Sequence, residues 1–237
     1  MKSGKLFLIP VTLGEDDDPS KVLSAESLNI IHSLNEFIVE NEKSARNFLK
    51  RSGTKVAMQD LILHPMGKHV DLSQAGKYLD SALHGKNIGL LSEAGCPGIA
   101  DPGAEIVKHA HEKKIPVVPI VGPSSLLMAL MASGLNGQHF QFHGYLPIDK
   151  GERIRFLKNA ERNIRSSHCT QLFIETPFRN NQLLEDILKT VDGSIRLCIA
   201  CEITMSSEYI RTLKISDWKK TSLPDLHKRP AVFLLGE

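Results

Sequence analysis

The stretch from residue 88 to residue 104 constrains the fold more than any other part of the chain. It begins with an apolar run, Ile88–Leu91, which is typical of a short buried strand. Glycines and prolines then crowd a segment that can continue neither as a strand nor as a helix. They are Gly95, Pro97, Gly98, Pro102 and Gly103. Helical spacing of apolar residues follows, with Asp101 as the expected N-cap and Pro102 as the expected first helical residue.

A strand, an irregular loop and a helix in this order predict a loop at the carboxyl edge of a parallel sheet. Open α/β folds bind their ligands at that edge. A plain connection between strand and helix needs only about 2–6 residues. The segment from Ser92 to Pro102 is longer and consists mainly of small residues. The pattern therefore favours a loop whose main chain approaches a ligand over a purely structural turn.

Strand-like and helix-like segments alternate through the first half of the chain. Strands are expected within 5–9, 36–40, 55–64, 88–91 and 117–121. Helices are expected at 24–33, around 45–49, from Asp71 or Ser73 to His84, at 103–113 and at 126–132. This order predicts a mostly parallel sheet covered on both faces. The segment Gly134–Gly137 reads as a linker, so we expect domains at 1–137 and 138–237.

The second half predicts a smaller α+β domain with a mixed sheet. Its strands are expected at 140–142, 171–175, 195–203, 209–215 and 231–235, and its helices at 150–165 and from about residue 180 to 191. The basic residues of segment 150–165 are compatible with a solvated helix face or with phosphate binding. Gly122-Pro123-Ser124-Ser125 fits an ordinary helix start and an anion-binding helix N-terminus equally well.

The composition of the chain indicates little about its function, but it does suggest where in the cell the protein works. The chain has 237 residues, is 41% hydrophobic and carries a net charge of +2. It shows no signal peptide and no run long enough to cross a bilayer, so we expect a cytoplasmic protein without membrane contact. Cys198 and Cys201 lie within one expected strand and read as core residues, because nothing nearby completes a zinc site. The acidic run 15–18 reads as a solvated loop, and no metal is expected.

Several blocks resemble one known family. Residues 92–103, Ser-Glu-Ala-Gly-Cys-Pro-Gly-Ile-Ala-Asp-Pro-Gly, are similar to the block S-D-A-G-T-P-G-I-S-D-P-G of the ribosomal RNA small subunit methyltransferase I group. That group belongs to the tetrapyrrole (corrin/porphyrin) methylase superfamily. Four further blocks resemble the same family in the same order: 119–125, 140–147, 175–179 (Glu-Thr-Pro-Phe-Arg for E-S-P-H-R) and 202–208.

The resemblance implies a two-domain class III methyltransferase, usually a homodimer, with S-adenosylmethionine in a cleft between the domains. It also implies transfer to the ribose 2′-oxygen of a cytidine in small-subunit ribosomal RNA. Relatives in the superfamily methylate tetrapyrrole carbons instead. The residues that the resemblance assigns to the cofactor are Pro10, Ser92, Glu93, Ala94, Gly95, Pro97, Ser124, Ser125, Gly144 and Tyr145.

The acceptor side is less similar to the family. A ribose hydroxyl is a weak acid, so a base or a cation would help its attack. Our hypothesis gives this task to Glu202 or Glu208, with Arg179 positioning the acceptor or its phosphate; an ordinary structural role is the alternative for each glutamate. Cys201, Met205 and Ser207 replace residues that are Arg, Lys and His in the family. Two other functions therefore stay open: methylation of a tetrapyrrole or another small molecule, and a non-catalytic, cofactor-binding role.

Overall fold

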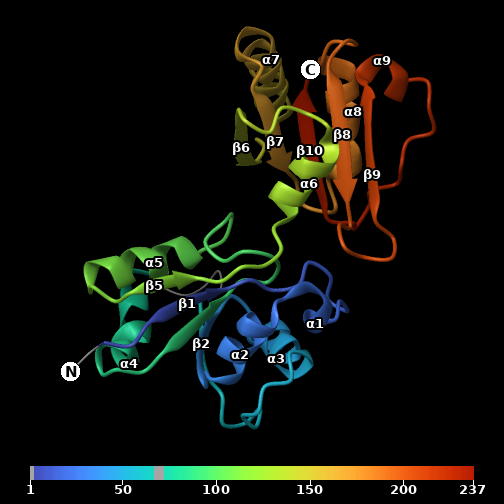
Figure 1. Ribbon diagram of the computed structural model, residues 1–237. Coiled ribbons are helices and arrows are strands. Elements are labelled where there is room, and N and C mark those ends of the chain that lie inside the picture. Colours follow the sequence, from blue (N-terminus) through green and yellow to red (C-terminus); the bar gives the residue numbers. More distant parts are fainter. Residues whose placement is uncertain (1–2, 67–71) are drawn as a thin grey trace. The chain divides into compact units, whose positions relative to one another are not determined.

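The computed structural model describes residues 3–66 and 72–237, and it divides the chain into two compact units (Figure 1). The first unit spans Met1–Ser124 and the second Ser125–Glu237. Each unit contains one five-stranded sheet. The two-sheet organisation expected from the sequence is therefore present.

The first unit is built on a parallel sheet with the strand order β3-β2-β4-β1-β5. Its elements are β1 Leu6–Ile9, α1 Pro19–Val22, α2 Ala25–His32, β2 Glu36–Val39, α3 Glu42–Arg51, β3 Ile62–Pro65, the 3₁₀ helix η1 Leu72–Leu79, α4 Asp80–Leu83, β4 Ile88–Leu91, α5 Gly103–Glu112 and β5 Val117–Pro119. Because all its pairings are parallel, the loops after β1, β2, β4 and β5 emerge at one edge of the sheet.

Apolar side chains cover both faces of this sheet, as a parallel sheet requires. On one face, α2 and α3 contribute Ile31, Phe48 and Leu49 to one buried cluster. On the other face, η1, α4 and α5 contribute to a second cluster, with Ile106 of α5 fully buried. Gly89 is needed in the central strand β4, because a Cβ there would lie 2.5 Å from the ring of Phe37.

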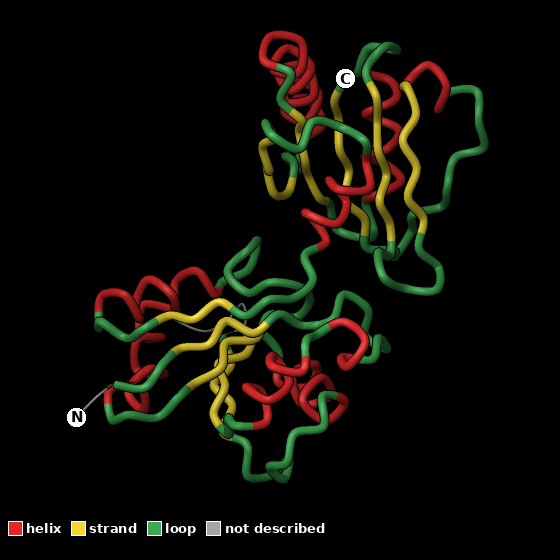
Figure 2. The backbone as a smooth tube through the Cα atoms, in the orientation of Figure 1, coloured by secondary structure: helices red, strands yellow, loops and turns green. Residues whose placement is uncertain are grey.

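The second unit holds a mixed sheet with the order β6-β7-β10-β8-β9 (Figure 2). Its elements are α6 Ser125–Ser133, β6 Phe140–Tyr145, α7 Lys150–Ser167, β7 Thr170–Ile174, α8 Asn180–Thr190, β8 Arg196–Cys201, β9 Tyr209–Lys214, α9 Ile215–Trp218 and β10 Ala231–Gly236. Only β6 and β7 are parallel neighbours; the other pairs are antiparallel. The expected mixed sheet is confirmed.

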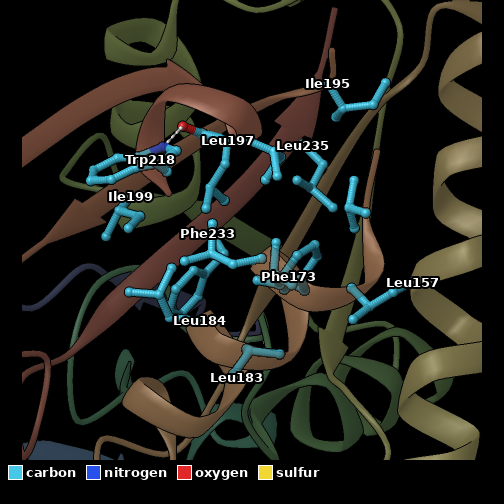
Figure 3. Packing of buried hydrophobic residues seen from close by; sticks show 14 of the residues in the cluster. Leu157, Phe173, Leu183, Leu184, Ile195, Leu197, Ile199, Trp218, Phe233 and Leu235 are labelled. Atoms are coloured by element: carbon cyan, nitrogen blue, oxygen red, sulfur yellow. Dashed lines mark hydrogen bonds between the residues drawn. The ribbon is translucent and has the colours of Figure 1, made fainter. Parts of the chain in front are cut away.

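The main core of the second unit lies between this sheet and helices α7 and α8 (Figure 3). Phe173 and Phe233 stack across neighbouring strands, with ring centroids 6.0 Å apart. Trp218 is fully buried and its indole Nε1 donates a hydrogen bond of 2.9 Å to the carbonyl oxygen of Leu197. Cys198 and Cys201 are free and fully buried, and burial raises the pKa of Cys201 to about 11, as suits core cysteines.

Two local expectations differ from the structure. Helix α6, which the sequence places in the first domain, packs on β9 and β10, so the compact units divide at Ser124 rather than at residue 137. The helix expected to end at His84 is mostly a 3₁₀ helix, with only α4 as an α-helix; one of its two expected starts, Asp71, lies outside the described residues.

Candidate active site

The loop after β4 is folded upon itself by its own side chains. The Ser92 hydroxyl is buried and donates to the carbonyl oxygens of Gly95 and Ala94, at 3.0 and 3.3 Å. Gly95 and Gly98 have φ angles of 71° and 82°, in the left-handed region that glycine adopts without strain. These two glycines therefore allow the main chain to turn back on itself, as the sequence indicates.

Asp101 organises the second half of this loop. Its Oδ1 accepts hydrogen bonds from the amides of Gly98 and Gly103, at 2.7 and 2.8 Å. The helix starts at Gly103 with Pro102 as its N-cap residue, so the expected positions of Asp101 and Pro102 were one residue too early. Asp101 nevertheless binds the first helical amide. Burial raises the pKa of its carboxyl, because the charged form loses hydration.

Three loops at the carboxyl edge of the first sheet are joined to one another. Val11, after β1, exchanges two backbone hydrogen bonds with Gly95, after β4, at 2.9 and 3.0 Å. The Cys96 thiol donates to the carbonyl oxygen of Pro123, after β5, at 3.3 Å. Gly122 lies so close to Pro10 that a Cβ at residue 122 would be 2.4 Å from the Cβ of Pro10. The edge is thus one continuous main-chain surface.

A carboxylate from the second strand also reaches this surface. Glu40 directly follows β2, and its Oε2 accepts a hydrogen bond of 3.3 Å from the amide of Glu93. This contact joins the loop after β2 to the loop after β4. Glu40 was not among the site residues predicted from the sequence, although its position directly after a strand was an available signal.

Seven of the ten residues assigned to the cofactor lie together at this edge. They are Pro10, Ser92, Glu93, Ala94, Gly95, Pro97 and Ser124. Glu93 and Ala94 are exposed, whereas Gly95 and Pro97 are buried. The other three belong to the second unit: Ser125 begins α6, and Gly144 and Tyr145 end β6. Their binding of the same cofactor stays a prediction.

The candidate acceptor residues gather at one edge of the second sheet. Strands β6, β7 and β8 run in the same direction, because β7 and β8 are both antiparallel to β10 between them. The segments 175–179 and 202–208 follow β7 and β8, and the segment 225–230 precedes β10. The pairing therefore brings three segments distant in sequence to one edge.

Glu202 forms an ion pair with Arg229. Arg229 Nε donates to Glu202 Oε2 at 2.8 Å, and its NH2 group also donates to the carbonyl oxygen of Ser207 at 2.9 Å. The hydrogen bond from Arg229 lowers the pKa of the Glu202 carboxyl. Glu202 also has a φ of 50°, and its amide is bound to the carbonyl oxygen of Pro230 at 2.9 Å. Glu202 therefore links segment 202–208 to segment 225–230.

The other two candidates also contact their own chain. Glu208 is exposed, and its Oε2 accepts a hydrogen bond of 2.8 Å from the amide of Thr204. Arg179 is paired with the buried carboxylate of Glu175 and donates to the Thr176 hydroxyl at 3.3 Å. Arg229 could not be predicted as the partner of Glu202, because no local sequence pattern joins residues that far apart.

The ion pair predicts how stability depends on pH. The Glu202 carboxyl binds a proton less tightly in the folded state than in the unfolded chain, where it has its ordinary pKa of 4.5. The carboxylate therefore stabilises the fold fully above that pKa, and this contribution is lost as the pH falls through the lower folded pKa. We expect Glu202→Gln to be less stable than the wild type at about pH 7, with the difference shrinking from about pH 4.5 downward.

Urea unfolding at several pH values checks this expectation. Arg229→Gln is the matched background, since Glu202→Gln made in it should show little pH-dependent effect of its own. A stability difference that stays constant across the acid range would contradict the ion pair as the cause.

The described residues contain neither a group of metal ligands nor a membrane-spanning helix. In residues 3–66 and 72–237 no three His, Cys, Asp or Glu side chains are grouped so that they could hold a metal ion. No helix in this part of the chain is both long and apolar enough to cross a membrane.

Comparison with known proteins gives consistent matches over most of the chain. The family model for tetrapyrrole (corrin/porphyrin) methylases matches residues 24–218. The ribosomal RNA small subunit methyltransferase I of Buchnera aphidicola (strain Sg) is 30% identical over 237 residues, which cover 99% of this chain and 79% of that protein. The protein of the same name from Escherichia coli O157:H7 is 28% identical over 98% of this chain and 77% of its own.

Solved structures show the same fold at lower identity. The methyltransferase CobJ superposes with a TM-score of 0.64 at 17% identity, covering 99% of this chain and 95% of CobJ. The uroporphyrin-III C-methyltransferase of Thermus thermophilus, complexed with S-adenosylhomocysteine, gives a TM-score of 0.57 at 18% identity over 99% of this chain and 98% of its own. These likenesses confirm the expected two-domain class III methyltransferase fold.

Proposed function

The chain belongs to the tetrapyrrole (corrin/porphyrin) methylase family, whose model matches residues 24–218, and from that premise we propose that it methylates RNA of the small ribosomal subunit. It is an S-adenosylmethionine-dependent methyltransferase. The observation that carries the proposal is the 30% identity, over 99% of this chain, to a protein named ribosomal RNA small subunit methyltransferase I. The acceptor in our proposal is the 2′-oxygen of a cytidine ribose.

We place the cofactor on the three joined loops of the first unit. The groups available there suit a nucleoside that carries both polar and apolar parts. Main-chain atoms of the exposed residues Glu93 and Ala94 and the hydroxyl of Ser124 offer hydrogen bonds. Exposed Ile99 and Val121 on the same loops, 52% and 83% accessible, offer apolar contact. One buried oxygen, Asp101 Oδ2, has no hydrogen-bond partner within the described chain.

The chemistry asked of the protein is chiefly positional. S-adenosylmethionine supplies a methyl group that its sulfonium charge already activates. The three loops have to hold that group in line with the acceptor and exclude water. Glu208 is exposed and accepts one amide hydrogen bond, whereas Glu202 is paired with the Arg229 guanidinium, so Glu208 is better placed to accept the proton of the ribose hydroxyl. In this proposal Glu202 and Arg229 hold segment 202–208 in place.

Methyl transfer to ribosomal subunits tests the proposed function. Small subunits from cells lacking this protein should accept labelled methyl from S-adenosylmethionine, and the label should map to one cytidine ribose. Small subunits from cells that contain the protein are the matched control and should accept little, because their site is already modified. A failure of the deficient subunits to accept label would overturn the proposal.

Two subsidiary expectations accompany this function. In our proposal the protein works in the cytoplasm, and the resemblance implies that it works as a homodimer. Sedimentation at micromolar concentration should give twice the chain mass of 26.2 kDa. A monomer that is fully active in the transfer assay would contradict the dimer and leave the reaction untouched.

One observation favours a second candidate. Cys201 and Met205 stand where the family has Arg and Lys, so this segment offers less positive charge to an RNA, as it would in a relative that binds the cofactor without catalysis. The transfer assay separates the two functions when it is combined with a binding measurement. Binding of S-adenosylmethionine without transfer to RNA or to a tetrapyrrole would support the non-catalytic candidate.

A further inference from the structure

An aromatic ring stands exposed at the acceptor edge of the second sheet. Phe178 lies in the turn between β7 and α8, and 68% of it is accessible. A single exposed apolar side chain is ordinary on a protein surface, so the exposure of Phe178 gains meaning from the residues around it. Phe178 directly precedes Arg179, the residue we assign to the acceptor.

Two residues of segment 225–230 border this ring. The Nζ of Lys228 lies 5.9 Å from the centroid of the Phe178 ring, within range of a cation–π contact. The His227 ring meets Phe178 edge-on, with centroids 5.9 Å apart and an interplanar angle of 76°. The aromatic surface is thus accompanied by a cation, the combination with which proteins bind single-stranded nucleic acid.

Hydrogen bonds hold together the main-chain segments beneath this group. The amide of Lys228 donates to the carbonyl oxygen of Pro177 at 3.0 Å, which ties the two segments together. Asn180 Nδ2 donates to the carbonyl oxygen of Arg229 at 2.6 Å, and the amide of Leu226 donates to Asn181 Oδ1 at 2.8 Å. Leu226 itself is fully buried. A surface held in this way loses little conformational entropy when a ligand binds.

We propose that Phe178 is the platform on which an unstacked base of the acceptor RNA stacks, with Lys228 binding a neighbouring phosphate. Methylation of a ribose within RNA requires access to a nucleotide, and unstacked bases are recognised by stacking on aromatic side chains. The ring supplies the stacking face and Lys228 the complementary charge. This inference rests on the proposed function and names the residues that would read its substrate.

Substitutions at residue 178 separate ring stacking from simple apolar contact. Phe178→Leu keeps an apolar side chain but removes the ring, so we expect affinity for single-stranded RNA to fall about 5- to 100-fold. Phe178→Trp keeps a ring and should bind within about twofold of the wild type. Phe140→Leu is the matched control. Phe140 is also exposed, at 42%, but it is the first residue of β6 and so lies at the edge of the sheet opposite to the acceptor edge.

The probe is a fluorescein-labelled single-stranded RNA of mixed sequence, measured by anisotropy and compared with the same strand in a duplex. Phe178→Trp adds a direct signal. The single natural tryptophan, Trp218, is fully buried, so the wild type serves as the blank. Single-stranded RNA should quench the added indole, whereas the duplex should quench it less. The native emission of Trp218 shows whether Phe178→Leu is folded.

The outcomes separate this inference from the proposed function. Wild-type methyl transfer to ribosomal subunits, together with equal RNA affinity of Phe178→Leu and Phe140→Leu, would overturn the platform and leave the function standing. An unquenched indole in Phe178→Trp would also overturn the platform. If the wild type neither transfers methyl to the subunits nor binds the RNA, both proposals fail. A ring that binds only a protein segment of the ribosome would likewise overturn the platform.

Discussion

Replacing Gly122 by alanine is expected to lower kcat/KM for methyl transfer by about 100-fold. The added Cβ would lie 2.4 Å from the Cβ of Pro10 and 3.2 Å from Leu23. Pro10 cannot rotate away, because its ring is part of the main chain. The loop after β5 must therefore separate from the loop after β1. A displacement of about 1 Å at a reacting centre can cost about 100-fold in rate.

Binding of S-adenosylmethionine by calorimetry and transfer to ribosomal subunits check this result. Overpacking should cost about 1–3 kcal/mol in stability, so the comparison is made well below the unfolding temperature. Gly137→Ala is the control, because a Cβ at Gly137 would meet no atom within 4 Å. If the Gly122 variant binds the cofactor as tightly as the Gly137 variant, the cofactor does not bind to these joined loops.

Replacing Asp186 by alanine is expected to destabilise the second unit by about 3–5 kcal/mol. Asp186 in α8 pairs with Arg153 in α7, and both side chains are almost completely buried, at 6% and 5% accessible. The Arg153 guanidinium also donates to the carbonyl oxygens of Pro147 and Ile148. Removal of the carboxylate leaves a buried positive charge without its counter-ion, which is the costly way to break such a pair.

Urea unfolding followed by Trp218 fluorescence measures this loss, since Trp218 reports on the second unit alone. Glu185→Ala is the neighbouring control. Glu185 pairs with Lys189 at the surface, where an ion pair contributes at most about 1 kcal/mol. Equal midpoints for the two variants would show that the buried pair contributes no more than the exposed one.

The elements with a strong periodic pattern could be predicted from the sequence. Ile88–Leu91 is a strand with the expected bounds, and the helix after it begins at Gly103. Alternation of these patterns was sufficient to predict the parallel sheet. The assignment of α6 to the first domain failed, because α6 is apolar on all sides and its sequence does not show which sheet it covers.

The candidate site could be predicted only where it depends on local sequence. Ser92 and Asp101 shape the loop 92–103 through hydrogen bonds to residues close in the chain, so the local sequence was sufficient to predict the loop. The partner of Glu202 could not be found in this way. Arg229 reaches Glu202 because β10 pairs with β8, and that contact is set by the sheet rather than by spacing. The exposure of Phe178 likewise depends on tertiary packing.

The position of β10 in its sheet affects how the second unit folds while the chain is being synthesised. This strand follows every other strand of its sheet along the chain, yet it lies between β7 and β8. Until its residues leave the exit tunnel, the edges of β7 and β8 face a gap, and the nascent second unit exposes unpaired strand edges. The first sheet is complete once β5 has emerged, so it can close earlier. Segment 225–230 thus acquires its place beside β7 and β8 only after the other four strands of its sheet have been synthesised.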